Sequence, residues 1–189
     1  MATVCARGES LTVNPASIMT SYTEGFFTAE ETAQGFPIFR GHSGDDEIWG
    51  THIEDVIFGG SGNDLIRAVE GDDALKGELG DDILYGGEGD DTLLGGLGDD
   101  KLYGGDGRDF LIGSYGDDTL IGGAGSDVFF INAGNNIIED FNTKGLTVDF
   151  FVLGKFLTNV KWKQDGGNLL ISSDQGVTTI LNADVGDFI

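Results

Sequence analysis

The sequence predicts an all-β fold in which short strands stack into a solenoid, and three observations lead to that prediction. A nine-residue pattern repeats ten times without a break between residues 41 and 130. Position eight of every repeat is large and apolar, and glycine fills position one and position four in nine of the ten repeats. A strand of about three residues with one inward side chain is too short to be stable alone, so it has to stack on identical neighbours.

The repeats are aligned by two columns that run through all of them. In order, the repeats read GHSGDDEIW, GTHIEDVIF, GGSGNDLIR, AVEGDDALK, GELGDDILY, GGEGDDTLL, GGLGDDKLY, GGDGRDFLI, GSYGDDTLI and GGAGSDVFF. Position eight supplies the expected core, which consists of Ile48, Ile57, Ile66, Leu75, Leu84, Leu93, Leu102, Leu111, Leu120 and Phe129. Position six is always aspartate: Asp46, Asp55, Asp64, Asp73, Asp82, Asp91, Asp100, Asp109, Asp118 and Asp127.

The glycines and aspartates together predict a cation site in each loop. Glycine permits positive φ and lets backbone carbonyls approach a common centre without obstruction by a Cβ atom. Stacking at about 4.8 Å per rung turns the aspartates into columns of like charge, which require counter-ions. Residues 41–130 contain 22 acidic and four basic residues, a net charge of −18. Carboxylate and carbonyl oxygens in an irregular cage are the ligands that calcium accepts better than magnesium does.

The pattern GGxGxDxUx, with U a large apolar residue, resembles the nonapeptide motif of RTX (repeats-in-toxin) proteins. GGEGDDTLL and GGLGDDKLY match it at every defined position, and the resemblance covers residues 41–130. The resemblance implies a right-handed parallel β-roll, in which two repeats form one turn and like loops lie eighteen residues apart. One edge would then hold Asp46, Asp64, Asp82, Asp100 and Asp118, and the other edge Asp55, Asp73, Asp91, Asp109 and Asp127. Five loops per edge leave four gaps, so up to about eight calcium ions are expected.

In this arrangement each ion would share two aspartates and several backbone carbonyls. The carbonyls are expected at glycines of positions one, two and four: Gly59, Gly60, Gly62, Gly77, Gly80, Gly86, Gly87, Gly89, Gly95, Gly96, Gly98, Gly104, Gly105, Gly107, Gly113, Gly116, Gly122, Gly123 and Gly125. Two repeats depart from the pattern, with Ile53 at position four of one, and Ala68 and Val69 at positions one and two of the other. The gap between Asp55 and Asp73 is therefore expected to be the weakest or empty.

Segments on both sides of the array are expected to cap it. Residues 1–40 contain the breaker Asn14-Pro15 and an aromatic cluster of Tyr22, Phe26, Phe27, Phe36 and Phe39, and are interpreted as an N-terminal cap. Residues 131–189 are interpreted as a β-rich C-terminal cap, with strands expected at 146–153, 160–164, 169–171 and 177–181 and a hairpin turn at 165–168. This region resembles the one that follows RTX arrays and carries a type I secretion signal. The ending Asp187-Phe188-Ile189 is similar to the end of such signals.

Composition and missing motifs argue against several classes of function. The net charge of −23 argues against nucleic acid as a partner. The sequence contains no apolar run of 18 residues, so no transmembrane segment is predicted. The lone Cys5 cannot form an intrachain disulfide, and no apolar signal-peptide core begins the sequence. Neither HExxH nor GxSxG occurs, His42 and His52 are expected to be outward loop residues, and the paired aspartates at positions five and six are interpreted as a solvated acidic face.

These observations predict a non-enzymatic calcium-binding protein or module at an extracellular or cell-surface location. It would be exported by type I secretion machinery and folded by extracellular calcium, in a structural or interaction role. The alternative is an auxiliary module that binds extracellular polysaccharide, similar to those of secreted alginate epimerases. In either case the chain is compatible with a place in a larger secreted protein.

Overall fold

The computed structural model describes residues 2–6, 9–13, 28–31, 35–142, 148–155 and 157–183, with side chains from residue 35 onward. All regular elements in these ranges are strands, which confirms the all-β prediction. Asn14-Pro15, Tyr22, Phe26, Phe27, residues 146–147 and Asp187-Phe188-Ile189, to which the sequence assigned roles, lie outside the described residues.

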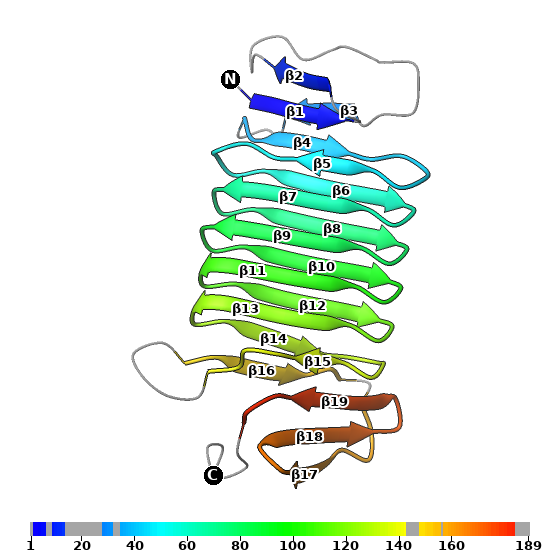
Figure 1. The fold of residues 1–189 in the computed structure, drawn as a ribbon. Coiled ribbons are helices and arrows are strands. Elements are labelled where there is room, and N and C mark those ends of the chain that lie inside the picture. Colours follow the sequence, from blue (N-terminus) through cyan, green and yellow to red (C-terminus); the bar gives the residue numbers. More distant parts are fainter. Residues whose placement is uncertain are drawn as a thin grey trace.

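Figure 1 shows most of the strands stacked as the rungs of one elongated body. In chain order the strands are β1 (Ala2–Ala6), β2 (Glu9–Val13), β3 (Thr28–Glu31), β4 (Pro37–Arg40), β5 (Glu47–Trp49), β6 (Val56–Ser61), β7 (Leu65–Glu70), β8 (Ala74–Leu79), β9 (Ile83–Glu88), β10 (Thr92–Leu97), β11 (Lys101–Gly107), β12 (Phe110–Tyr115), β13 (Thr119–Gly125), β14 (Val128–Ile131), β15 (Ile137–Ile138), β16 (Phe150–Leu153), β17 (Lys161–Asp165), β18 (Asn168–Ser173) and β19 (Gly176–Ile180).

The repeats alternate between two parallel sheets. Even-numbered strands from β4 to β16 form one sheet, and odd-numbered strands from β5 to β15 form the other. Within the array, neighbouring strands of one sheet pair eighteen residues apart, so Leu93 of β10 lies between Leu75 of β8 and Leu111 of β12. Two repeats therefore make one turn, and the architecture is the expected parallel β-roll.

Most strands in the array have six residues, longer than the expected three. The extra residues are the first three of the following repeat, as in β10, where Gly96 pairs with Glu78 and Leu97 with Leu79. These positions lack a shared apolar side chain, so their pairing leaves no hydrophobic pattern in the sequence. Their backbone groups nevertheless join the ladder because the loops of one edge stack in register.

The core is a single apolar column between the two sheets. All ten position-eight side chains are buried, at 0–2% exposure, as the sequence predicted. At the C-terminal end the rings of Phe129, Phe141 and Phe151 continue this column, with successive centroids 5.7 and 5.9 Å apart. The array is thus filled by residues that recur every nine positions, and beyond it the rings of Phe141 and Phe151 continue the packing.

Strand pairing continues past both ends of the repeats. At the N-terminal end β4 pairs in parallel with β6, β3 pairs antiparallel with β4, and β1 and β2 form an antiparallel hairpin. At the other end β16 pairs in parallel with β14, and β19 with β15. Strands β17, β18 and β19 are antiparallel, and Asp165 pairs with Asn168 across the hairpin turn that the sequence predicted.

Candidate metal centre

Glycine is required in the loops for two different reasons. Position-four glycines have positive φ, between 106° and 149° in the nine repeats that carry them. Position-one glycines have no such φ, but a Cβ atom on Gly59 or Gly104 would collide with the carboxylate of the aspartate five residues later. The first group therefore shapes the loop, and the second makes room for the position-six side chain.

The position-six aspartates form the two columns expected from the sequence. In each column the Oδ1 atom accepts a hydrogen bond from the backbone N–H of the aspartate eighteen residues earlier, at 2.7–3.0 Å. Asp46 is half-buried and the other nine are buried, at 0–2% exposure. The backbone thus holds each carboxylate in a fixed orientation inside its loop.

The second carboxylate oxygen is buried without a partner in most of these loops. Among the described residues, eight buried side-chain oxygens have no hydrogen-bond partner, and all are Oδ2 atoms of position-six aspartates: Asp64, Asp73, Asp82, Asp91, Asp100, Asp109, Asp118 and Asp127. A buried ionised oxygen without a partner is costly, so native proteins pair such groups or place them against metal ions.

Burial changes the protonation of these aspartates. Loss of solvation is the largest cause, and it raises the pKa of Asp73 and Asp100 from 3.8 to about 8. The pKa rises to about 7 for Asp91 and Asp109, and to about 6 for Asp55, Asp64, Asp82, Asp118 and Asp127. Like charges in adjacent rungs add to the effect for Asp100, which lies between Asp82 and Asp118. The loops therefore favour ionised aspartate only when positive charge compensates it.

The first loop of each edge differs from the rest. The N–H groups of His42 and Thr51 donate to the Oδ2 atoms of Asp46 and Asp55, at 2.9 and 2.5 Å, and the Thr51 hydroxyl donates to the Asp55 Oδ1 at 3.1 Å. Position two has positive φ in the eight later loops but not in these two. Val69 is one of the position-two residues with positive φ, so the loop of Asp73 keeps the shared shape although it lacks the opening glycines.

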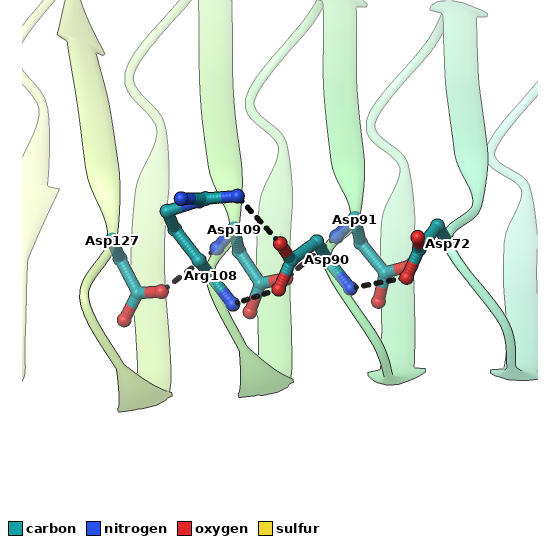
Figure 2. Close-up of polar contacts among 6 residues, drawn as sticks. All are labelled: Asp72, Asp90, Asp91, Arg108, Asp109 and Asp127. Atoms are coloured by element: carbon teal, nitrogen blue, oxygen red, sulfur yellow. Dashed lines mark hydrogen bonds and ion pairs between the residues drawn. The ribbon is translucent and has the colours of Figure 1, made fainter.

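Position five forms a second, exposed column beside the first. Figure 2 shows the N–H of Asp90 donating to the Asp72 carboxylate, and the Arg108 N–H and guanidinium donating to the Asp90 carboxylate. The hydrogen bonds run in the opposite direction to those between Asp91, Asp109 and Asp127 in the same view. The acidic face predicted from the paired aspartates is exposed, and it also ties successive loops together.

Both buried columns extend into residues that the sequence analysis missed. The N–H of Asp118 donates to the Asn136 Oδ1, and the N–H of Asp127 donates to the Asp149 Oδ1, both at 3.0 Å. Asn136 stands at position six of INAGNNIIE, in phase with the repeats, so its position was a usable signal. Asp149 is four residues out of phase, and its only signal is that Asp149-Phe150-Phe151 resembles Asp127-Val128-Phe129.

The oxygen-rich loops fit a hard divalent cation. A point beside Gly59, where a Cβ atom would lie, is close both to the Asp64 Oδ2 and to the Gly77 carbonyl oxygen of the next rung; Gly86 and Gly104 show the same arrangement. No group of three or more His, Cys, Asp or Glu side chains that could hold a metal occurs in the described part of the chain. A site made of two aspartates and several carbonyl oxygens does not require a third such side chain, and this ligand set suits calcium.

Comparison with known proteins identifies the repeats. The model of the RTX calcium-binding nonapeptide repeat (4 copies) matches residues 38–66, 67–102 and 103–138, which is more than half of the chain. No curated protein matches the sequence. In the described residues no helix is long and apolar enough to cross a membrane.

Two solved structures share limited similarity with the chain. The extracellular lipase LipA from Serratia marcescens is 18% identical with a TM-score of 0.34, over 77% of this chain and 39% of the lipase chain. The AlgE6R3 subunit of the Azotobacter vinelandii mannuronan C5-epimerase is 23% identical with a TM-score of 0.22, over 73% of this chain and 71% of that subunit. The family model, together with the loop geometry and the aspartate columns, shows that the chain belongs to the RTX calcium-binding nonapeptide repeat family.

Proposed function

We propose that this chain is a secreted calcium-binding module, without enzymatic activity, whose roll folds when calcium binds and which serves a structural or interaction role. The observation that carries the proposal is the set of eight buried Oδ2 atoms without partners, arranged as four on each edge. Calcium supplies compensating positive charge in such loops. This chain's residues orient the carboxylates, exclude water and present carbonyl oxygens.

The ligands proposed are the position-six aspartates from Asp64 to Asp127 and the carbonyl groups of the loop glycines. The number of about eight ions is that of the gaps between like loops, and seven of the eight oxygens without partners, those of the aspartates from Asp64 to Asp118, lie in loops of these gaps. The eighth belongs to Asp127, the last position-six aspartate of its edge. The Asp55 carboxylate already accepts two hydrogen bonds from Thr51, one from the N–H and one from the hydroxyl, and Asp55 is the first aspartate of its column. Both features support a weak or empty gap between Asp55 and Asp73. Charge agrees with this number, because eight divalent ions nearly neutralise the net −18 of residues 41–130.

Circular dichroism with and without calcium tests the proposal. In calcium-free buffer at pH 8 the repeats are expected to lose most of their β signal, because the buried aspartates are then ionised without compensation. If calcium stands at ten times its Kd, each site contributes about 1.4 kcal/mol, and eight independent sites about 11 kcal/mol, which is comparable to the stability of a whole domain. An equally ordered chain in both buffers would overturn the proposal. Magnesium at the same concentration is the control.

Export is proposed to precede folding. A roll that needs calcium stays unfolded where calcium is scarce, so the chain could pass through a type I exporter and fold outside the cell. The experiment compares secretion of the whole chain and of a variant that ends before Val177, in a strain that carries such an exporter. Loss of secretion only in the shortened variant is expected. Equal secretion of both would refute the role of the C-terminal region.

A further inference from the structure

One buried oxygen without a partner lies at the end of the array, where the repeats no longer provide a following loop. Asp127 is fully buried, and its Oδ2 is directed into the space beside Gly122. In the array, the corresponding space beside Gly59, Gly86 or Gly104 is completed by a carbonyl oxygen of the next rung. GGAGSDVFF is the last repeat on this edge, so residues outside the repeats have to complete the space beside Gly122.

Asp149 occupies the place of the missing position-six aspartate. Its Oδ1 accepts the Asp127 N–H at 3.0 Å, as every aspartate of the column does from its predecessor. Asp149 is buried, and β16, which follows it, pairs with β14 in the register of the roll. The four extra residues between Asp127 and Asp149 therefore lengthen the turn without moving the carboxylate out of its column.

Asp140 adds a second carboxylate at the same place. It accepts hydrogen bonds from the N–H groups of Gly122 and Gly123, at 2.9 and 2.7 Å, and so lies against the glycine beside which the Asp127 Oδ2 is buried. The negative charges of Asp149 and Asp140 both act on Asp127. Both oxygens of Asp140 and the Asp149 Oδ2, which accepts the Asn142 N–H at 2.7 Å, thus contact backbone N–H groups, whereas the Asp127 Oδ2 has no partner.

We propose that Asp127 and Asp149 hold a calcium ion beyond the nonapeptide repeats, with Asp140 at its rim, between the roll and the C-terminal strands. This inference rests on the proposed function, because it extends the same chemistry to a place outside the matched repeats. The site joins the last repeat to β16. Calcium binding is thereby linked to the docking of the C-terminal region on the roll.

The experiment counts bound calcium by equilibrium dialysis with the whole chain, in wild type, D149N and D165N. D149N removes one charge and keeps an oxygen for the Asp127 N–H. D165N removes the same charge from an exposed residue at the end of β17, outside both columns. We expect D149N to bind one ion fewer than wild type, and D165N to bind the wild-type number. Equal numbers in wild type and D149N would overturn this inference alone, whereas a wild type without bound calcium would overturn the proposed function as well.

Terbium luminescence separates a metal ligand from a structural cap. Trp162 packs on Phe151, with ring centroids 5.7 Å apart, and Phe151 follows Asp149 by two residues. In a W49F background, terbium emission excited through Trp162 is expected to fall at least several-fold in D149N, with the β signal in calcium retained. Unchanged emission would mean that Asp149 only closes the column. If D149N does not fold, D140N is measured instead: several-fold weaker binding of one ion supports the site, and unchanged binding overturns it.

Discussion

The position-six aspartates are alike in sequence but differ in what their second oxygen contacts. Asp100 is buried with its Oδ2 without a partner, and its pKa rises to about 8 between Asp82 and Asp118. Asp55 is also buried, but its Oδ2 accepts the Thr51 N–H. The distinction depends on the φ angle at position two, which decides whether the loop turns an N–H toward its own aspartate.

This distinction predicts unequal effects of two substitutions. Asp100→Ala removes a carboxylate from the middle of a column and interrupts its stacking, so the calcium midpoint of folding is expected to rise several-fold and the transition to broaden. Asp55→Ala affects the first loop of its edge and is expected to shift the midpoint little. Calcium titrations followed by circular dichroism compare them. Equal effects would mean that the two loops hold their ions in the same way.

Val69 is a β-branched residue with φ of 98°, a conformation that such residues rarely adopt. We predict that Val69→Gly stabilises the roll by about 1 kcal/mol, because the relief of strain exceeds the added flexibility of the unfolded chain. Thr51→Gly is the matched change at position two of the preceding loop on the same edge, where the φ of Thr51 is not positive. It is expected to destabilise by about 1 kcal/mol, through loss of the hydroxyl contact with Asp55. Urea unfolding in saturating calcium measures both, and a destabilised Val69→Gly would contradict the strain argument.

At the scale of elements, the outer face of the odd-numbered sheet carries a ladder of planar side chains. The Arg67 guanidinium of β7 lies 4.9 Å from the Trp49 ring centroid in β5 and 5.2 Å from that of Tyr85 in β9. Tyr85 stacks in turn on Tyr103 of β11, with centroids 4.6 Å apart and planes inclined by 10°. The ring faces are directed along the stack, so the ladder joins four successive strands of the sheet.

Replacing the charged member of the ladder is expected to weaken it on both sides. Arg67→Ala should lower the free energy of unfolding by about 1 to 2 kcal/mol, and Arg67→Lys should recover only part, because lysine keeps the charge without the plane. Arg108→Ala is the control, since its exposed guanidinium pairs only with the Asp90 carboxylate among the interactions described, and such surface pairs contribute little. Equal urea midpoints for Arg67→Ala and Arg108→Ala would show that the ladder adds no stability.

The strands and loops also show which features of the fold and of the candidate site could be predicted from the sequence. The nine-residue phase predicted the buried column and the stacking of aspartates, because both depend on side chains that recur in phase. The eighteen-residue register was implied by the resemblance to RTX repeats. Asp149 was missed because four added residues break the phase while the backbone restores the position. The gap between Asp55 and Asp73 was predicted to be the weakest because both loops lack glycines. The structure shows that the two loops differ: the Thr51 N–H donates to Asp55, whereas Val69 has the positive φ of the later loops. No residue type in the sequence indicates this difference.

At the scale of the whole molecule, nine buried aspartates are expected to make folding depend on both calcium and pH. Their folded pKa values lie between about 6 and about 8, above the ordinary 3.8. At a pH between the ordinary pKa of 3.8 and these folded pKa values, the folded chain binds more protons than the unfolded chain. Without calcium, this stabilisation is therefore fully present below about pH 4 and is lost as the pH rises through about 6 to 8.

We accordingly predict that acid partly replaces calcium. In calcium-free buffer the β signal at pH 5 should exceed that at pH 8, because protonation removes the charge that the buried columns cannot tolerate. With calcium present the dependence reverses: bound ions require ionised aspartates, so the calcium midpoint should rise several-fold between pH 8 and pH 6, with protons released on binding. Circular dichroism and calorimetry in two buffers of different ionisation enthalpy measure these effects, and sedimentation checks for association near the pI of about 4.1. A calcium-free chain that is equally disordered at pH 5 and pH 8 would show that something other than the charge of these aspartates keeps the roll unfolded.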